Sequence, residues 1–528
     1  MTASETRLRS DAALAPLRAA PDPDVSVTWA RTDTTIVVAL VCAVLVAGFW
    51  NLGRLPLSAD EGAAWAISGH GLGQMVDALR GSGGDLAAGL YYALLWAWVR
   101  AFGTSELALR SLSVLAAGAT VVPFYATGRR LGRTVAVSAT VLLVANPLFL
   151  GYARTARAYA LATLLVVLSC YLFVRAIEAD TGGTWTAYTI VSIAAVYVHW
   201  FAALVVLAQF AGVALWPRGD PRLRHALRSG VVLLLGLLPI ALLVAFGKTN
   251  NVGWIAPLDR GELEGLVRTF ARSGWWPVEL LCLVLVVVAV RVTVRSLRAN
   301  RASEDSRLQV LSVAWLGVPV LVAVVVSLAK PLLIPRYLMV ALPGFALVLA
   351  IGLAAVAVRV RWVGLGAFIA LMAAGVSAYQ GPYEVRHSDE DFRTIAATVG
   401  AHIRPGDSVI VYPANAAFAF GYYAREWPGL ARRRGPDWPA ISWSSRFGSQ
   451  DPDPGSVVGA GRRVQSATVW LVMRTPHGPT VRADITHPPA LEALRRDLAK
   501  RYPYESVPVG MSSGATAYVV VSSKLPNS

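Results

Sequence analysis

The sequence is poor in charge for a protein of its length. Only 15% of its 528 residues are Asp, Glu, Lys or Arg, whereas 55% are hydrophobic, and the mean hydropathy is +0.53. A soluble globular protein usually carries about a quarter charged residues. This shortage argues against a chain built only of soluble domains and predicts a membrane protein.

Cysteine is also scarce. Cys42, Cys170 and Cys282 are the three cysteines of the chain, and each lies inside an apolar stretch. A thiol in such a place usually packs as a small apolar side chain. We therefore expect neither a disulfide framework nor a cysteine metal site.

Acidic residues are fewer than basic ones, 32 against 48, which gives a formal net charge of +16. Basic patches can bind nucleic acid. Most of this surplus, however, lies in short loops between apolar runs, where Lys and Arg mark the cytoplasmic side of a membrane. Nucleic acid is therefore not expected as a partner.

Three regions follow from the composition. Residues 1–33 are polar and rich in Pro and Ala, which predicts a disordered cytoplasmic tail, and residues 34–379 form the membrane region. The first apolar run has no convincing cleavage site, so we interpret it as a retained signal anchor. Residues 380–528 have the composition of a soluble domain, and their alternating helix and strand patterns predict an α/β fold.

Particular segments carry this α/β prediction. Helices are expected at 391–403 and 489–502, and strands at 407–413, 467–473 and 516–523. The stretch "DEDFR" (389–393) is expected to cap a helix and to dock the domain. An accessory role in acceptor binding is predicted for the whole domain.

Twelve apolar runs are long enough to be considered as membrane crossings, each crossing needing roughly 20 residues. They are 34–52, 87–102, 107–128, 134–151, 157–176, 184–200, 201–216, 229–247, 275–295, 309–329, 335–357 and 361–379. Twelve crossings from a cytoplasmic N-terminus would place the basic loops 128–133, 217–228 and 291–307 outside, against the positive-inside rule. If 87–102 is not a crossing, all three conflicts with the rule disappear. This run is short, aromatic and contains Arg100, which suits an interfacial helix.

The remaining eleven crossings predict a polytopic α-helical protein of the plasma membrane, with a cytoplasmic N-terminus and an extracytoplasmic C-terminal domain. Residues 53–104 become a long exoplasmic loop with the adjacent carboxylates Asp60 and Glu61, and with Asp85. Few basic residues remain on the outer face, and four lie where helices begin or end: Arg154, Arg157, Lys330 and Arg336.

These two sets of charges suit one kind of reaction. Arg and Lys at the headgroup level can bind a phosphate, and a carboxylate facing them can remove a proton from a hydroxyl. Sugar transfer from a lipid phosphate uses both, because charge develops on the departing phosphate while an acceptor hydroxyl attacks. A single displacement inverts the anomeric centre and requires only one base.

The membrane region resembles the GT-C superfamily of membrane glycosyltransferases. The similarity is to the branch with protein O-mannosyltransferases and aminoarabinose transferases, and it covers approximately residues 30–425. It is carried by the Asp60–Glu61 pair after the first crossing and by several spaced stretches. These are "FGTSELALRSLSVLAAG" (102–118), "GYARTARAYALATLL" (151–165), "PRYLMVALPG" (335–344) and "DEDFRTIAATVGAHIRPGDSVIVYP" (389–413).

The resemblance implies a role for each matching residue. Asp60 would be the catalytic base and Glu61 its positioning neighbour, while Arg157, Arg154 and Arg336 would bind the donor phosphate. Lys330 is a further candidate for that phosphate. The implied donor is a polyprenyl-phosphate sugar, and the acceptor is a glycan, a lipid or a protein.

One stretch departs from the family. Many relatives carry a His-Pro-Pro-Leu-Tyr-Tyr type sequence where this chain reads "GDLAAGLYY" (84–92), which keeps only the pair Tyr91 and Tyr92. Asp85, Tyr91, Tyr92 and His199 are therefore candidates for the acceptor side or its loop, and the acceptor stays open.

Structural interpretations compete with these roles. Asp60 and Glu61 also suit the start of a helix, Arg154 and Arg157 could anchor a helix end, and His199 suits an interfacial histidine. A divalent cation at Asp60 stays open, because hard cations prefer oxygen ligands but no D-x-D cluster is present. No other cofactor is predicted.

Three other functions compete with transfer of a single sugar. A transporter or lipid flippase would have as many crossings, although such proteins usually keep ionisable groups within the membrane. A GT-C ligase would move whole glycans from a lipid pyrophosphate. A scaffold would share the fold without activity.

Overall fold

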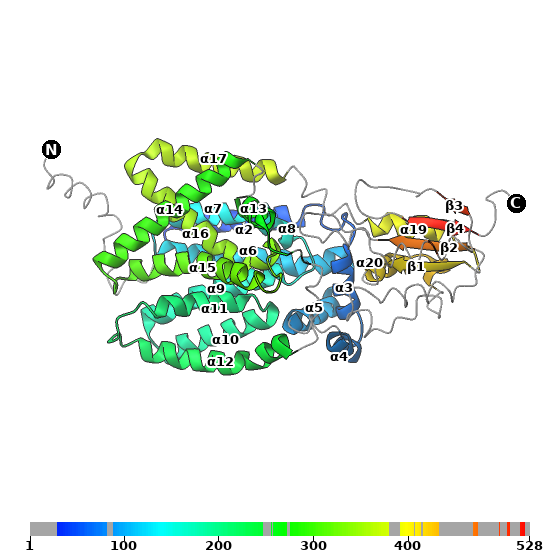
Figure 1. Ribbon diagram of the computed structural model, residues 1–528, viewed down its shortest axis with the longest axis horizontal. Coiled ribbons are helices and arrows are strands. Elements are labelled where there is room, and N and C mark those ends of the chain that lie inside the picture. Colours follow the sequence, from blue (N-terminus) through cyan, green and yellow to red (C-terminus); the bar gives the residue numbers. More distant parts are fainter. Residues whose placement is uncertain are drawn as a thin grey trace.

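The structure, a computed structural model, describes residues 29–81, 88–246, 255, 257–271, 275–379, 391–405, 407–412, 416–431, 468–473, 496, 504–506 and 518–522. The described residues from 29 to 379 form a helical body (Figure 1). The described residues from 391 to 522, here called the α/β region, lie at one end of that body (Figure 1).

Long apolar helices form the helical body. They are α2 (Arg31–Phe49), α6 (Glu106–Arg129), α9 (Tyr159–Ala179), α12 (Leu223–Phe246), α14 (Trp276–Ala299), α15 (Glu304–Ser327) and α16 (Leu342–Arg359), the last preceded by the 3-10 turn η3 (Pro335–Ala341). Further helices complete it: α7 (Arg133–Val144), α8 (Pro147–Ala153), α10 (Gly182–Val198), α11 (Ala202–Val213) and α17 (Arg361–Tyr379).

The predicted polytopic helical membrane fold is confirmed. Each of the eleven predicted crossings coincides with one of these helices or with the consecutive pair α7 and α8. By length and composition, seven helices among the described residues can cross a membrane, or eight if α7 and α8 count as one bent span. The number eleven therefore stays a prediction.

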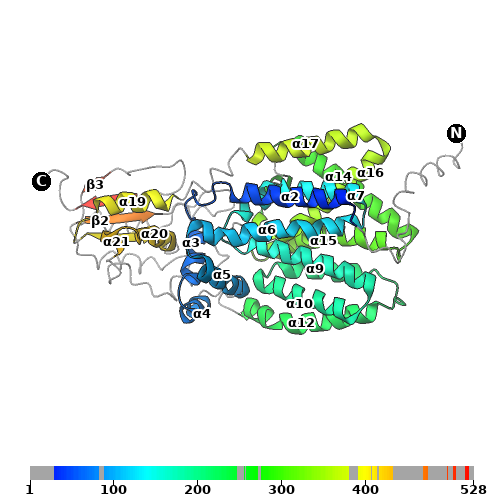
Figure 2. The ribbon, with the colours of Figure 1, turned by 180° about the vertical axis from the view of Figure 1, so that it is seen from behind.

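Four further helices of the body are amphipathic or short: α3 (Ala59–Ser68), α4 (Leu72–Gly81), α5 (Gly89–Phe102) and α13 (Arg260–Ala271). Helix α5 corresponds to the run 87–102, has 14 residues and is not among the candidate spans. It lies beside α3 at the end of the body that faces the α/β region (Figures 1 and 2). The first predicted exoplasmic loop is thus largely helical.

The exterior and the interior of the body differ as expected for a membrane protein. Large apolar side chains are exposed on the outside, such as Leu234 (74%) and Trp362 (76%). Inside, small residues let helices approach closely, as is common in membranes. A Cβ atom on Gly352 of α16 would lie 2.4 Å from the carbonyl oxygen of Leu285 on α14, so glycine is required there.

Helices α7 and α8 are separated by a break that ends at Asn146, directly before Pro147. Pro147 stands at the first position of α8, where its missing N–H costs nothing. The side chain of Asn146 caps the same helix by accepting a hydrogen bond from the N–H of Leu148 at 2.9 Å. The two helices are bent by 58°. The short helix α8 then ends at Ala153, directly before Arg154 and Arg157.

The α/β region contains a four-stranded sheet with strand order β1-β2-β4-β3. Its strands are β1 (Ser408–Tyr412), β2 (Thr468–Met473), β3 (Tyr504–Ser506) and β4 (Tyr518–Ser522), and its helices are α19 (Phe392–His402), α20 (Ala416–Ala424) and α21 (Pro428–Ala431). Strands β1 and β2 are parallel, and β4 is antiparallel to both β2 and β3.

Several sequence-based expectations can be compared with this region. The helix at 391–403 and the three predicted strands are present, whereas β3 and α20 were not predicted. Of the helix expected at 489–502, only Arg496 is described, and it is helical. The boundary proposed at residue 380 lies outside the described residues. Figure 2 shows α20 between the sheet and α3.

Candidate active site

Helix α3 carries both adjacent carboxylates, and its first turn explains why they differ. Ser58 caps the helix: its hydroxyl accepts a hydrogen bond from the N–H of Glu61 at 3.3 Å. The carboxylate of Glu61 in turn accepts one from the N–H of Ser58 at 3.1 Å. This reciprocal capping box directs Glu61 back toward the start of the helix and leaves Asp60 on another face.

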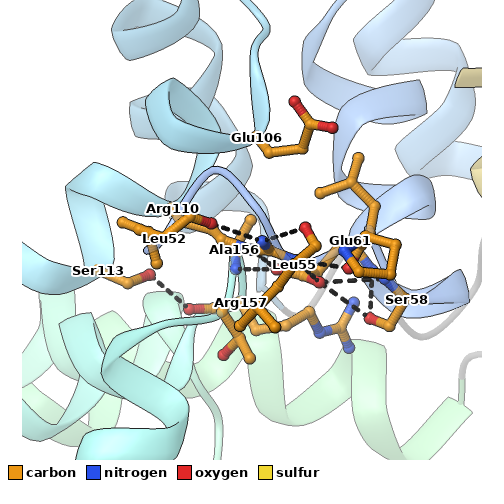
Figure 3. A network of polar contacts seen from close by, with 12 residues as sticks. Leu52, Leu55, Ser58, Glu61, Glu106, Arg110, Ser113, Ala156 and Arg157 are labelled. Atoms are coloured by element: carbon orange, nitrogen blue, oxygen red, sulfur yellow. Dashed lines mark hydrogen bonds and ion pairs between the residues drawn. The ribbon is translucent and has the colours of Figure 1, made fainter. Parts of the chain in front are cut away.

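Glu61 is the centre of a buried polar network (Figure 3). Arg110 of α6 donates two parallel hydrogen bonds to its carboxylate, both at 2.7 Å. The remaining N–H groups of Arg110 bond to the carbonyl oxygens of Leu52, Leu55 and Pro56 at 2.8–2.9 Å. All five N–H groups of the guanidinium are therefore used, and the loop before α3 is fixed to α6.

The same carboxylate also reaches the turn between α8 and α9. The N–H of Ala156 donates a hydrogen bond to Glu61 at 3.0 Å. The next residue is Arg157, and its guanidinium lies 3.5 Å from the backbone carbonyl oxygen of Asp60 and 3.4 Å from the hydroxyl of Tyr92. Glu61 thus joins the helix of Asp60 to the turn of Arg157, and its own oxygens are saturated by these donors.

Asp60 is placed differently. Its side chain is 38% exposed, and its carboxylate lies 4.0 Å from the guanidinium of Arg336, which is itself 28% exposed. Arg336 belongs to η3, at the start of the chain segment that continues into α16. The structure therefore brings together Asp60, Arg157 and Arg336, residues that are far apart in the sequence.

Aromatic side chains surround these charges. The ring of His199 lies 5.2 Å from that of Tyr159 and 6.1 Å from that of Tyr337, and Tyr152 packs against Tyr159 at 4.7 Å. Tyr152 and Tyr159 flank the turn of Arg154 and Arg157, and Tyr337 follows Arg336. An anion held here would lie between guanidinium groups and neutral rings.

Two polar atoms next to this cluster are buried without a hydrogen-bond partner among the described residues. They are the hydroxyl of Tyr91 and Nδ1 of His199. Burial raises the pKa of the Tyr91 phenol, so the hydroxyl stays protonated and can donate. Unpaired buried polar groups cost about 1–3 kcal/mol each, and two such groups favour a polar ligand between them and Arg157.

Three predicted site residues remain: Arg154, Lys330 and Asp85. Arg154 donates a hydrogen bond to the carbonyl oxygen of Trp50 at 2.7 Å and so fixes the end of α2. Lys330 is exposed, and its side chain has no hydrogen bond or ion pair with any residue that the structure describes. Asp85 lies outside the described residues.

The surroundings of Asp60 suit an anion better than a cation. Among the described residues, no group of three or more His, Cys, Asp or Glu side chains comes together. The guanidinium of Arg336 lies 4.0 Å from the carboxylate of Asp60, and that of Arg157 lies 3.5 Å from the backbone carbonyl oxygen of Asp60. A hard divalent cation prefers several oxygen ligands, so the described residues do not fit a resident metal ion at Asp60.

Comparisons with known proteins give one matching family model and several similar solved structures. Residues 88–245 match the family model described as dolichyl-phosphate-mannose-protein mannosyltransferase. Among solved structures, the chain is similar to ArnT from Cupriavidus metallidurans, in the apo state (TM-score 0.54) and bound to undecaprenyl phosphate (TM-score 0.55). Each match has 15% sequence identity and covers 93% of this chain and 99% of ArnT. These matches show that the chain has the GT-C fold.

A third match supports the GT-C fold. The Archaeoglobus fulgidus oligosaccharyltransferase, tethered with an acceptor peptide, has a TM-score of 0.52 at 9% identity, covering 92% of this chain and 73% of the other. No curated protein matches the sequence significantly. The resemblance predicted from the spaced motifs, to the branch of mannosyltransferase-like and ArnT-like proteins, is confirmed.

Sequence reasoning missed the most highly connected residue of this GT-C site, Arg110. Its signal was present, because an arginine inside the predicted crossing 107–128 requires a partner within the membrane protein. Tyr152, Tyr159 and Tyr337 were also missed as site residues, although all three lie in stretches that carried the family resemblance.

Proposed function

We propose that this GT-C protein transfers a single sugar from a polyprenyl-phosphate donor to an acceptor hydroxyl in one inverting displacement. The observation that carries the proposal is the placement of Asp60 in the first turn of α3, accessible and 4.0 Å from Arg336, while the guanidinium of Arg157 lies 3.5 Å from the backbone carbonyl oxygen of Asp60. The likeness to an ArnT structure that contains undecaprenyl phosphate supports the class of donor.

Each side chain has a defined task in this reaction. Asp60 takes the proton of the acceptor hydroxyl, and the acceptor oxygen forms a bond to the anomeric carbon from the face opposite the phosphate. The bond between that carbon and the phosphate oxygen breaks, and its electron pair leaves with the polyprenyl phosphate. Arg157 and Arg336 stabilise the charge that develops on this phosphate. The proton then passes from Asp60 to water.

Glu61 has a different task in this mechanism. It accepts hydrogen bonds from Arg110, Ser58 and Ala156, so its lone pairs are occupied and it holds Asp60 against the turn of Arg157. Tyr91 and His199, whose polar atoms lie unpaired and buried, are proposed to contact the bound substrate. Arg154 is proposed to hold the same turn, and Lys330 to attract the donor headgroup from the surface.

Topology completes the proposal. The N-terminus is cytoplasmic, α3 and the α/β region lie on the extracytoplasmic side of the plasma membrane, and transfer takes place at that surface. The distribution of basic loops supports this orientation. The acceptor is a hydroxyl of a glycan, lipid or protein.

The experiment is a donor panel offered to the purified protein in nanodiscs. Polyprenyl-phosphate hexoses and pentoses are compared with one polyprenyl-pyrophosphate glycan, using alkyl glycosides and Ser/Thr peptides as acceptors. Release of polyprenyl phosphate and the anomeric configuration of the product are measured. We expect release from a monophosphate donor and an inverted product.

Three results would contradict the proposal. Consumption of the pyrophosphate glycan alone would indicate a ligase. A product with retained configuration would require a different mechanism. Movement of the lipid across the bilayer with no bond broken would indicate a flippase.

A further inference from the structure

The α/β region is in direct backbone contact with the helix that carries Asp60. Gly62 of α3 faces Ala419 of α20 so closely that a Cβ atom on Gly62 would lie 2.3 Å from the Ala419 nitrogen and 2.6 Å from its Cα atom. Real Cβ contacts are not that short, so any side chain at residue 62 must displace one helix from the other. Gly62 is two residues from Asp60.

A second contact fixes α20 to the helical body. Glu106, the first residue of α6, accepts hydrogen bonds from Arg393 at 2.8 Å and from the hydroxyls of Tyr422 and Tyr423 at 3.2 Å each. Arg393 also donates to the carbonyl oxygen of Arg54 at 2.8 Å. This agrees with the docking role predicted for the stretch "DEDFR", in which Asp391 caps α19 by accepting from the N–H of Thr394 at 3.0 Å.

Tyr423 connects this contact to the start of α3. Its hydroxyl accepts a hydrogen bond from the N–H of Leu57 at 2.7 Å while bonding to Glu106. Leu57 precedes the capping residue Ser58, and both Leu57 and Tyr423 are buried. One turn after Glu106 on α6, Arg110 donates two hydrogen bonds to Glu61 of α3. Helix α3 is therefore clamped between α6 and α20.

We propose that docking of α20 sets the position of Asp60, and that Gly62, Tyr423 and Glu106 are positioning residues for the transfer reaction. The α/β region then belongs to the reaction centre, beyond the accessory role in acceptor binding that its sequence suggests. This proposal rests on the proposed function, because it assigns Asp60 the role of the base. A displacement of about 1 Å at a reacting group can cost as much as 100-fold in rate.

The first test compares Gly62→Ala with Gly73→Ala. Both glycines lie in short helices of the same loop, but a Cβ on Gly73 meets nothing within 4 Å. We expect kcat to fall about 10- to 100-fold in Gly62→Ala, with the KM for the polyprenyl-phosphate sugar within a factor of two. Gly73→Ala is expected to keep wild-type kcat. Equal kcat values for the two variants would overturn the proposal.

Tyr423→Phe gives a second test that inserts no atom into the contact. It removes the hydroxyl that joins Leu57 to Glu106 and keeps the packing of the ring, and we expect a smaller fall in kcat at an unchanged KM. A fall in kcat that disappears once the rate is normalised to folded protein would show a merely structural role and would overturn the proposal.

A measurement that does not depend on enzyme activity distinguishes this proposal from the proposed function. Hydrogen–deuterium exchange of residues 58–68 is expected to rise in Gly62→Ala and Tyr423→Phe, and not in Gly73→Ala. Faster exchange in these two variants, with no donor consumption by the wild type, would support the positioning of α3 by α20 and contradict sugar transfer. Sugar transfer by the wild type, with unchanged exchange in all variants, would support the proposed function and contradict the positioning of α3 by α20.

Discussion

The two ends of the helical body each hold an aspartate among arginines, but they hold it differently. Asp33, in the first turn of α2 and away from the sheet, is fully buried. It accepts a hydrogen bond from Tyr125 at 2.6 Å and lies 3.3 Å from both Arg129 and Arg133. Asp60, at the end near the sheet, is 38% exposed and lies 4.0 Å from Arg336.

This difference supports a structural role for Asp33 and the proposed reactive role of Asp60. Removing a buried carboxylate that is surrounded by donors destabilises the fold, because it leaves the partner charges uncompensated. An accessible carboxylate near cations can take a proton from a substrate and release it to water. The same contrast separates the neighbours Glu61 and Asp60, which a sequence shows only as a pair.

Glu61→Gln has the largest expected effect on stability. Removing one charge from a buried pair leaves Arg110 uncompensated and should cost about 3–5 kcal/mol. Thermal unfolding in detergent would show a strongly lowered unfolding temperature. The control is Glu264→Gln, because Glu264 pairs with exposed Arg260 and Arg268 and should change little. An unfolding temperature equal to that of the wild type would show that the Glu61–Arg110 pair does not stabilise the fold.

Arg336→Gln is expected to lower kcat about 10²- to 10³-fold at an unchanged unfolding temperature, because it removes a charge aimed at the leaving phosphate. Steady-state transfer from a polyprenyl-phosphate sugar measures this effect. Arg268→Gln, an exposed arginine on α13, is the matched control. A kcat within twofold of the wild type would show that the phosphate is bound elsewhere.

Asp33→Asn tests whether the end of the helical body that is remote from Asp60 takes part in the reaction. The loss of a buried charge bonded to Tyr125 should destabilise the protein by about 1–3 kcal/mol. The rate per folded molecule should stay at the wild-type value, because this end of the body is remote from Asp60. A reduced rate with an unchanged unfolding temperature would mean that both ends take part in the reaction.

Lys330→Gln has the smallest expected effect. An exposed charge contributes about 0–1 kcal/mol, so the KM for the donor should rise at most about fivefold, and the difference should disappear at high salt. A kcat lowered as strongly as in Arg336→Gln would place the Lys330 side chain at the reacting phosphate.

The apolar runs predicted the helices well because burial in lipid requires length and apolar composition, both visible in a sequence. The bend between α7 and α8 was merged into one run, although Asn146 and Pro147 are typical of a helix start. Helix α20 was missed because "AAFAFGYYA" (416–424) follows a strand and has no clear period. The contact of α20 with Gly62 could not be predicted either, because the two segments are far apart in the sequence.

The sequence predicted several of the residues that come together at the candidate site, but not the contacts that each of them makes. Asp60, Arg157 and Arg336 were named from spacing and resemblance, and they lie close together in the structure. The capping box of Ser58 and Glu61 could have identified Glu61 as a structural partner from four letters, "SADE". Arg110 could be assigned to Glu61 only in three dimensions, because the two residues come from different helices.

The most direct test of Asp60 as the reactive carboxylate is the rate of polyprenyl-phosphate release by Asp60→Asn at saturating donor, with the unfolding temperature recorded on the same sample. The substitution keeps the shape of the side chain and removes the base. We predict a fall of about 10²- to 10⁴-fold in rate at the unfolding temperature of the wild type. A rate at least half that of the wild type would contradict the assignment and would place Asp60 with the structural carboxylates.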